Sequence, residues 1–306
     1  MSIVLWTLGF SSFAQSNCYP VEFHHGQLVV KIDSPGRSIS LKFDPAAPLE
    51  IFGDSGVDMN WRPPTAFTKQ LRWGRRPVDI CKSVDGTLGF RALEGIWLLD
   101  FDRHELCKIS REEMESYKAK GFHSIKARLD NSGFSIVIGI HWKSYWFRAN
   151  FKDRLAISAR HNNPFKFLNE PHFTVESTEG KLKLFPNKPV HFLQSNYSVN
   201  IGINDAKQSV GTNFIKSFNW IFDFQSRRVS AVKNGHSITG LVVPKFEVDI
   251  LKDSLLITRH RLDTGFKLGD VLLKVGNVEA STANLCQLAQ MIVEGEHQVT
   301  LQRNIK

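Results

Sequence analysis

Short runs of alternating apolar and polar residues follow one another from about residue 20 to residue 235. The clearest run is LVVKIDSPGRSISLKFD, in which Ser-Pro-Gly at residues 34–36 separates two alternating segments. Period-two alternation on both sides of a turn predicts a β-hairpin. Residues 110–121, SREEMESYKAKG, instead have the spacing, the serine cap and the terminal glycine of a helix. The pattern therefore predicts a mainly β body with a helical connector near its middle.

The body contains a weak internal repeat. The segments LGFRALEGIWLLDF and VGTNFIKSFNWIFDF start at Leu88 and Val210. Each begins with an apolar residue and a glycine and ends its apolar strand with Asp-Phe. Glycine and aspartate lie 11 positions apart in the first segment and 12 in the second. Such a repeat predicts two related β lobes, which we place at residues 20–110 and 122–235.

The remaining residues, 236–306, have a different pattern. FKLGDVLLKVGNVEAST predicts a turn, a strand and a second tight turn, and apolar residues then recur at helical spacing over residues 285–292. Ser281 or Thr282 is placed to cap this helix, and Gly295 to end it. The closing HQVTLQRN is typical of a strand. We therefore treat this segment as a separate domain.

GFKLGDVLLKVGNVEASTANLCQLAQMI follows the pattern Gly-Leu-x-x-Gly-Asp-x-Ile-x-x-Val-Asn-Gly, and the segment resembles a PDZ domain, a small β-barrel with a capping helix. The residues that match are Gly265, Gly269, Asp270, the turn Gly276-Asn277 and Arg303. The resemblance implies peptide binding by β-augmentation, with a terminal carboxylate held by backbone N–H groups. The residues that match this peptide-binding loop and strand are Thr239, Gly240, Leu241, Val242 and Val243. Internal packing of this strand, with a closed groove, is the alternative.

The paired apolar-Gly segments and the stretch DGTLGF, similar to Asp-Gly-Ile-Leu-Gly-Tyr, connect the body with a known family. The body resembles the bacterial pepsin- and retropepsin-like proteins that carry a C-terminal PDZ domain. The resemblance implies one catalytic aspartate in each lobe, at the end of a strand and followed by Thr-Gly. Such a peptidase uses two carboxylates about 3 Å apart that share one proton.

Two motifs have the right composition for such a peptidase but the wrong position. Asp263-Thr264-Gly265 has too little chain after it for a second lobe, and the PDZ pattern already accounts for its glycine. Asp54-Ser55-Gly56 falls just beyond the strand that follows the catalytic position, and its composition is that of a turn. We expect neither aspartate to be catalytic.

The catalytic position of the first lobe falls on Asp44, in ISLKFDPAAPLEIF. Pro45 and Ala46 replace Thr-Gly, which removes a hydroxyl and a backbone N–H and adds a Cβ. In the second lobe, SYWFRANFKDRLAIS places Asn150 where the other aspartate is expected, with Asp153 as a register-shifted alternative. An amide cannot accept and return a proton, so the resemblance implies a degenerate peptidase cleft. A strand-end carboxylate that accepts loop N–H groups is the structural alternative for Asp44.

The composition is that of a globular chain. It has 306 residues, 42% of them apolar and 23% charged, and a formal net charge of +9. No apolar run beyond the N-terminus has the length of a transmembrane helix. The densest basic cluster, Arg72, Arg75 and Arg76, is short, and the other cations alternate with apolar residues along strands. We expect no nucleic-acid binding and favour association with an anionic envelope surface.

The N-terminus and the cysteines bear on the compartment. An apolar stretch from Ile3 to Phe13, with small residues before a cleavage point after Ala14, predicts a signal peptide at residues 1–14. A buried first strand is the alternative. The four cysteines have neither CxxC nor metal-type spacing, so we expect no metal and no cofactor. Cys81–Cys107 is a candidate disulfide, with buried free thiols as the alternative.

The sequence thus indicates an exported protein of the periplasm or cell envelope that binds peptide or protein segments. Its aspartyl-protease-like body is that of a pseudoenzyme, and its PDZ domain is the expected binding module. One rival is an active aspartic endopeptidase with an atypical dyad that includes Asp44. The other is a purely structural envelope component.

Overall fold

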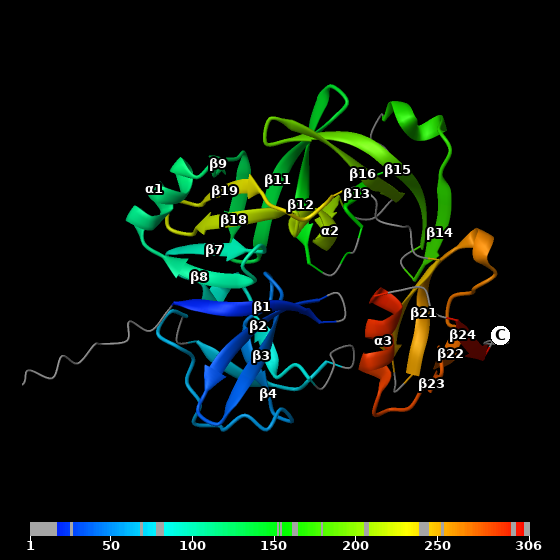
Figure 1. The fold of residues 1–306 in the computed structure, drawn as a ribbon, viewed down its shortest axis with the longest axis horizontal. Coiled ribbons are helices and arrows are strands. Elements are labelled where there is room, and N and C mark those ends of the chain that lie inside the picture. The colour runs from blue at the N-terminus through cyan, green and yellow to red at the C-terminus, as the bar shows by residue number, and fades with distance from the viewer. Residues whose placement is uncertain are drawn as a thin grey trace, which may run out of the picture.

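A computed structural model describes residues 17–24, 27–67, 70–77, 83–151, 153, 155–160, 165–178, 180–204, 208–238, 245–251, 254–294 and 298–302. The chain is mainly β, and its described strands form two sheets (Figure 1). The described helices are short: α1 (Arg111–Ala119), α2 (Thr212–Ile215), α3 (Leu285–Glu294) and the 3-10 turns η1 (Phe90–Ala92), η2 (Lys166–Asn169) and η3 (Leu262–Thr264). The predicted signal peptide, residues 1–14, lies outside the described residues. None of the described helices is long and apolar enough to cross a membrane.

The first sheet has eleven strands among the described residues, in the order β5-β4-β6-β3-β2-β1-β8-β7-β18-β19-β9. Its strands are β1 (Cys18–His24), β2 (Gln27–Ser34), β3 (Arg37–Phe43), β4 (Leu49–Phe52), β5 (Leu71–Gly74), β6 (Gly86–Leu88), β7 (Ile96–Asp100), β8 (Glu105–Ile109), β9 (His123–Ser124), β18 (Phe218–Asp223) and β19 (Arg228–Lys233).

The second sheet has thirteen described strands. The main order is β10-β11-β12-β17-β13-β16-β15-β14-β21-β22-β23, with β20 paired to β21 and β24 paired to β22. Its strands are β10 (Ala127–Asp130), β11 (Gly133–Ile140), β12 (Lys143–Asn150), β13 (Ile157–Arg160), β14 (Phe173–Ser177), β15 (Gly180–Phe192), β16 (Ser195–Asn204), β17 (Ser209–Gly211), β20 (Phe246–Leu251), β21 (Ser254–Arg261), β22 (Val271–Val275), β23 (Val278–Glu279) and β24 (Val299–Gln302).

The local signals in the sequence predicted their elements correctly. β2 and β3 form the expected hairpin, with Ser34 opposite Arg37 and Gly36 at a φ of 84°. Such a positive φ favours glycine, which has no Cβ. The predicted helix is α1, and Ser110 and Glu113 form a reciprocal capping box at its start.

The predicted repeat is visible in the strand pairing. We call residues 18–109 the first half of the body and residues 127–233 the second half. In the first half β6 pairs parallel with β3 and antiparallel with β4. In the second half β17 pairs parallel with β12 and antiparallel with β13. A short helical turn, η1 or α2, then leads into β7 or β18.

The two halves meet where β7 and β18 pair antiparallel. Leu98 lies opposite Ile221, Trp97 opposite Phe222 and Leu99 opposite Trp220. When Asp100 is aligned with Asp223, Leu98 is equivalent to Ile221, and these two residues pair with each other. The pairs on either side of them are then equivalent to one another, so the pairing is reciprocal. The second half therefore contributes β18 and β19 to the first sheet, so strand pairing crosses the boundary predicted between the lobes.

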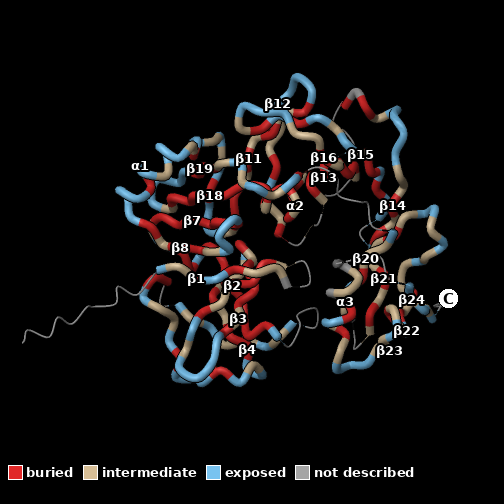
Figure 2. Tube along the Cα trace, viewed as in Figure 1, coloured by how far each residue is buried: buried red, intermediate tan, exposed pale blue. Residues whose placement is uncertain are grey.

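The core of the body is continuous across both halves. Its apolar cluster extends from Tyr19 to Ile238, and its largest fully buried side chains include Trp97, Trp220 and Phe134. Figure 2 shows buried positions running through β7, β8 and β18 at this junction. The two halves are thus held together by one hydrophobic core as well as by strand pairing.

Residues 245–302, which we call the C-terminal unit, have a core of their own. Leu255, Ile257, Leu272, Val275 and Leu288 are its most buried members. The expected strands and helix are present, but α3 begins after Asn284 and not after Ser281 or Thr282. Asn284 accepts from the backbone N–H of Ser281, and its carbonyl accepts from Leu288.

The C-terminal unit also shares a sheet with the second half of the body. β21 pairs antiparallel with β14, with Glu176 opposite His260 and Ser177 opposite Arg259. Figure 1 shows these two strands side by side. The predicted division at residue 236 thus separates two cores but is crossed by strand pairing.

One disulfide differs from the predicted one. Cys107 is bonded to Cys18, and the two residues lie directly opposite each other on β8 and β1. The candidate pair Cys81–Cys107 is therefore wrong, and Cys81 itself lies outside the described residues. Sequence spacing could not find the true pair, because 89 positions separate Cys18 from Cys107 and only the pairing of β1 with β8 brings them together.

Candidate functional site

Two glycines show that the loops after β3 and β12 are equivalent. A Cβ added at Gly89 would overlap the carbonyl oxygen of Ala47, and a Cβ added at Gly211 would overlap that of Leu155. Gly89 directly follows β6 and Gly211 is the last residue of β17, and a helical turn begins after each. At the residue before each helical turn, a carbonyl of the preceding loop lies so close to the backbone that only glycine fits.

This equivalence aligns Asp44 with Asn150. Phe43 lies opposite Leu88, one position before Gly89. Ala149 lies opposite Val210, one position before Gly211. The residue that follows is Asp44 in the first half and Asn150 in the second. Strand register thus gives these two residues the same place in their halves.

The carboxylate of Asp44 caps its own loop. Its Oδ1 accepts from the backbone N–H of Ala46 at 3.2 Å, and its carbonyl accepts from Ala47 at 2.9 Å. The side chain is half-buried. These contacts are those of a strand-end aspartate that holds a turn, the structural alternative foreseen from the sequence.

Apolar contact joins the two loops. The ring of Phe43, which precedes Asp44, meets the ring of Phe151, which follows Asn150, edge to face with centroids 5.3 Å apart. Where a peptidase of the resembled family has Thr-Gly, the first loop has Pro45, which is buried, and the second has Phe151. Among the described contacts, the loops therefore meet through aromatic packing at the place where threonine hydroxyls brace the loops of the resembled family.

The register-shifted alternative, Asp153, has partners in its own loop and in the C-terminal unit. Its carboxylate accepts from the hydroxyl of Ser158 at 2.8 Å and from the backbone N–H of Leu155 at 3.0 Å. It also lies 3.9 Å from the guanidinium of Arg259 in the C-terminal unit. Asp153 thus holds its loop and connects it to a neighbouring part of the molecule.

The two peptidase-like motifs are surface turns. Asp54 forms an ion pair with Arg76 at 3.0 Å, and Ser55 accepts from the N–H of Val57. Asp263 accepts from Nε of Arg261 at 2.9 Å, and this hydrogen bond lowers the pKa of Asp263. Neither motif lies in a loop equivalent to that of Asp44 or Asn150.

The C-terminal unit presents a strand beside a helix. Among the described strands β20 pairs with β21 alone, and α3 packs across its face. Val248 is buried, and Phe246 and Ile250 pack against the same core. The predicted peptide-binding residues Thr239, Gly240, Leu241, Val242 and Val243 lie outside the described residues.

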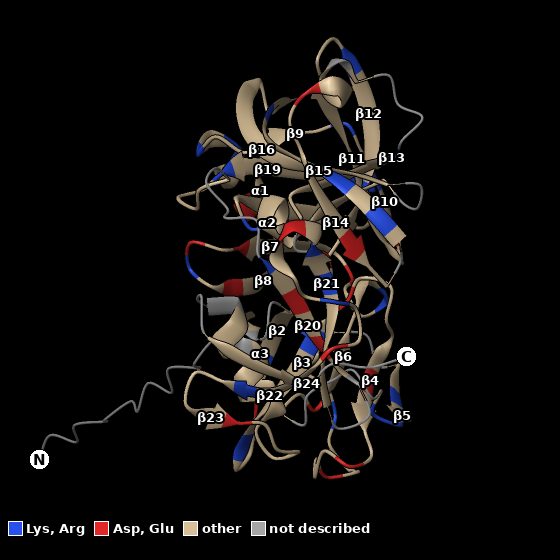
Figure 3. Ribbon diagram, turned by 90° about the vertical axis from the view of Figure 1, so that its right-hand side faces the viewer, with Lys and Arg blue, Asp and Glu red and all other residues tan. Residues whose placement is uncertain are grey.

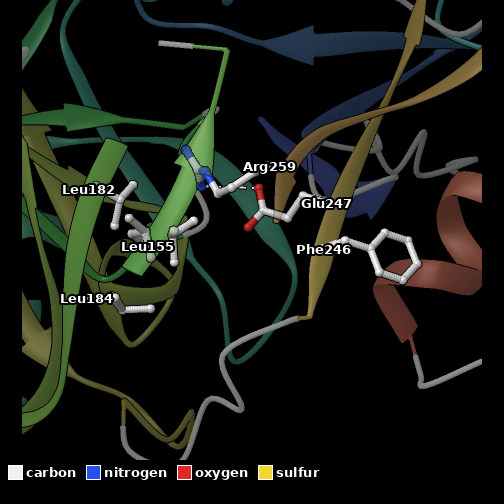
Figure 4. A pocket seen from close by; sticks show the side chains of 7 residues that line it. Leu155, Leu182, Leu184, Phe246, Glu247 and Arg259 are labelled. Carbon is white, nitrogen blue, oxygen red and sulfur yellow. Dashed lines mark hydrogen bonds and ion pairs between the residues drawn. The ribbon is translucent and has the colours of Figure 1, made fainter. Parts of the chain in front are cut away.

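The opposite face of β20 lies near the second half of the body. Glu247 forms an ion pair with Arg259 on the neighbouring β21 at 3.1 Å, and Arg259 lies 3.9 Å from Asp153 of the body. Figure 4 shows this pair beside a small cavity, with Leu155, Leu182 and Leu184 on the far side and Phe246 turned toward α3. The cavity measures about 10 Å³, room for roughly one water molecule.

Sequence reasoning missed this connection. Glu247 and Asp249 alternate with apolar residues along β20, and such a pattern usually places charges in water. Instead Glu247 is 15% exposed and Arg259 is 22% exposed, because the C-terminal unit packs on the second half of the body. Glu247 and Arg259 are partly buried against the second half of the body only because β21 pairs with the distant strand β14.

One cluster of metal-ligand residue types occurs among the described residues. Cys18, Glu105 and Cys107 place their ligand atoms close together. The two sulfurs are bonded to each other, and the Sγ of Cys107 lies 3.7 Å from the carboxylate of Glu105. A disulfide sulfur is not a thiolate ligand, so this cluster does not have the chemistry of a metal site.

Comparisons with known proteins add no assignment. No model of a known protein family matches the chain, and no curated protein matches it either.

Proposed function

We propose that this protein binds extended peptide segments through the C-terminal unit and does not cleave them. The observation that carries the proposal is the position of β20, which pairs on one side with β21 and has α3 packed across it. A strand edge beside an apolar helix face is the geometry used in β-augmentation. The resemblance of residues 236–306 to a PDZ domain supports the same mode of binding.

The surface between β20 and α3 would offer a bound peptide an apolar environment. Val248 and Ile250 on the strand and Leu285, Leu288 and Ile292 on the helix belong to one apolar cluster there. Gly265 and Gly269, which carry the match to the PDZ pattern, both have positive φ, a conformation that favours glycine. A peptide that ends in an apolar residue with a free carboxylate is therefore the ligand class we propose.

The body supports the non-proteolytic part of the proposal. Its repeated strand arrangement is compatible with the pepsin- and retropepsin-like resemblance, which gives Asp44 and Asn150 the two catalytic positions. A carboxylate and an amide cannot share and relay a proton as two carboxylates do. The Phe43–Phe151 contact further supports a cleft that has lost its catalytic bracing.

Export remains part of the proposal. The Cys18–Cys107 disulfide supports it, because such bonds persist mainly in oxidising compartments such as the periplasm. The predicted signal peptide would deliver the chain there.

The proposal is tested by peptide binding to the full-length chain. A display library of random peptides with free C-termini is selected on the protein, and fluorescence anisotropy then measures the selected sequences and their C-terminal amides. We expect selection of apolar C-terminal residues and at least tenfold weaker binding of the amides, because a buried charge-assisted hydrogen bond is lost.

Ile292→Glu places a charge among the apolar side chains between β20 and α3 and should abolish this binding. Leu273→Glu is the matched control, because Leu273 is 44% exposed on β22 of the same unit. Selection without any C-terminal preference, or equal binding by Ile292→Glu, would contradict the proposal. Cleavage of peptides at acid pH that Asp44→Ala abolishes would instead support the rival peptidase.

A further inference from the structure

The outward face of β10, β11 and β12 collects cations around a tryptophan. The guanidinium of Arg128 lies 4.3 Å from the ring centroid of Trp146, and the ammonium of Lys126 lies 6.0 Å from it. Arg128 and Lys126 are exposed, and Trp146 is half-buried. Figure 3 shows how the Lys and Arg positions are distributed over this side of the molecule. This face thus combines positive charge with an aromatic surface.

We call Lys126, Arg128 and Trp146, together with Trp142 and Lys143 at the adjoining hairpin tip, the basic aromatic surface. β11 lies between β10 and β12, with Arg128 opposite Ser135 and Val137 opposite Trp146. The nearby Arg148 pairs with Asp130 at 3.7 Å and adds less net charge.

Trp142 stands at the end of this surface. It lies in the turn between β11 and β12, beside Lys143, and 92% of its area is exposed. It is the most exposed of the large apolar side chains in the described residues. Transfer of a water-exposed tryptophan ring at a hairpin tip into a less polar environment is favourable, because it lowers the free energy of the system.

We propose that the basic aromatic surface docks on a bilayer that contains anionic phospholipid. Lysine and arginine near such a bilayer are attracted by its negative surface potential, and tryptophan prefers the boundary between headgroups and acyl chains. The net charge of +9 adds a long-range attraction to the same partner.

The shape of this surface favours a bilayer over a polyanionic chain such as DNA. No described cavity is lined by any of the five residues of the surface, whereas single-stranded nucleic acid is usually held in a positively charged groove. The ring of Trp146 already has Arg128 and Lys126 close to it, so of the two tryptophans only Trp142 is open for base stacking. A planar bilayer surface needs no groove.

Vesicle binding by the full-length chain tests the proposal. Vesicles of phosphatidylcholine with phosphatidylglycerol are floated on a density gradient with the protein, beside vesicles of phosphatidylcholine alone. We expect binding to the anionic vesicles only, and loss of binding at high salt as the charges are screened. A blue shift of tryptophan fluorescence should accompany binding and be smaller in Trp142→Ser.

The variants measure the role of each part of the surface. Each cation near an anionic bilayer contributes about a fivefold gain in affinity, so the triple variant Lys126→Gln, Arg128→Gln, Lys143→Gln should bind roughly a hundredfold more weakly. Trp142→Ser should bind about tenfold more weakly, because its apolar area stays in water. The control for charge is Arg72→Gln, Arg75→Gln, Lys267→Gln, and the control for exposed apolar area is Met59→Ser, since Met59 is 75% exposed; both controls should bind as the unchanged chain does.

Three results would overturn the proposal. The first is no binding to anionic vesicles, and the second is equal loss of binding in the control triple variant. The third is tighter binding to duplex DNA than to vesicles in a competition experiment, which would assign the surface to a polyanion. Circular dichroism of each variant establishes that a loss of binding is not a loss of fold.

Discussion

The loops after β3 and β12 occupy the same place in two halves of one body but differ in chemistry. Six positions separate Asp44 from Glu50, which pairs with Thr87, and eight separate Asn150 from Ser158, which pairs with Ser209. The first loop is closed by its own aspartate and two prolines. The second is longer and is held by Asp153, which lies near Arg259 of the C-terminal unit. A shared backbone frame therefore fixes where the loops meet, and leaves their side chains free to diverge.

The backbone arrangement shared by the two loops depends on Gly89 and Gly211. Substitution of either glycine should give the largest loss in the free energy of unfolding. Gly89→Ala and Gly211→Ala would each force a Cβ into a loop carbonyl. We expect each to lower the free energy of unfolding by about 4 kcal/mol or more, because the backbone must move to relieve the overlap. Urea denaturation followed by circular dichroism measures the loss.

Gly53→Ala is the control for these glycines. The nearest atom to its added Cβ is the carbonyl oxygen of Gly74 at 3.8 Å, an ordinary contact. It should change the free energy of unfolding by less than about 1 kcal/mol. If only one of Gly89→Ala and Gly211→Ala is severe, the two halves do not share the frame described above.

The next largest effect is a difference between Asp153 and Asp44 in their contribution to the free energy of unfolding. Asp153→Ala removes two hydrogen bonds and an arginine neighbour, and should cost about 2 kcal/mol of unfolding free energy. Asp44→Ala removes a half-exposed turn contact and should cost less than about 1 kcal/mol. Thermal unfolding of both variants in parallel compares them. A larger loss for Asp44→Ala would show that the first loop, and not the second, depends on its carboxylate.

A third comparison uses the turns that follow β7 and β18. Asp100 and Asp223 are both buried at the start of these turns, and a later residue in each, His104 or Arg227, has positive φ. Burial, the largest single effect, raises the pKa of Asp223. Hydrogen bonds from Ser226 and Arg111 outweigh it and hold this pKa below its ordinary value of 3.8.

A folded-state pKa that is depressed stabilises the protein above the unfolded pKa, and this stability is lost as pH falls through the folded value. Asp223→Asn should therefore cost about 1.5 kcal/mol near neutral pH and flatten the acid dependence of unfolding below about pH 4. Urea denaturation across this range tests it. If the unfolding free energy of Asp223→Asn still falls with decreasing pH as it does in the unchanged chain, other carboxylates control acid unfolding.

The smallest effect concerns peptidase activity at the loops of Asp44 and Asn150. Asn150→Asp adds a second carboxylate without the threonine hydroxyls of the resembled family, and the Phe43–Phe151 contact stays between the loops. We expect no peptidase turnover by this variant or by the unchanged chain between about pH 3 and pH 7, because misplacement of catalytic groups by about 1 Å costs roughly a hundredfold in rate. Release of a quenched fluorescent peptide is the assay. Turnover by Asn150→Asp that a transition-state-mimic inhibitor blocks would contradict this expectation.

Local chemistry made part of this structure predictable. Ser34-Pro35-Gly36 determines a turn, Ser110 and Glu113 cap a helix, and the two apolar-Gly segments mark equivalent strands. From those strands, counting along the chain was enough to match Asp44 with Asn150. Each of these signals lies within a few residues of the feature that it predicts.

Pairings between distant strands could not be predicted in this way. The partner of Cys107 depends on which edge β1 joins, and the approach of Arg259 to Asp153 depends on β21 lying beside β14. Such choices follow from how whole edges and faces fit together, and many strands in this chain have similar apolar alternation. The start of α3 was predicted too early, because Ser281 and Thr282 are suitable capping residues but the helix begins only at Leu285.

The reciprocal pairing of β7 with β18 has a consequence for how such a chain arises. Leu98 and Ile221 face each other at the centre, and positions on either side exchange partners, as in a contact between two identical subunits. A chain with only one half would present the same edge and could close it with a second copy of itself in the same register. The body therefore has the geometry of a homodimer joined into one polypeptide. Within one polypeptide the loop after β3 and the loop after β12 can differ from each other, which the two copies in a symmetric dimer encoded by one gene cannot do.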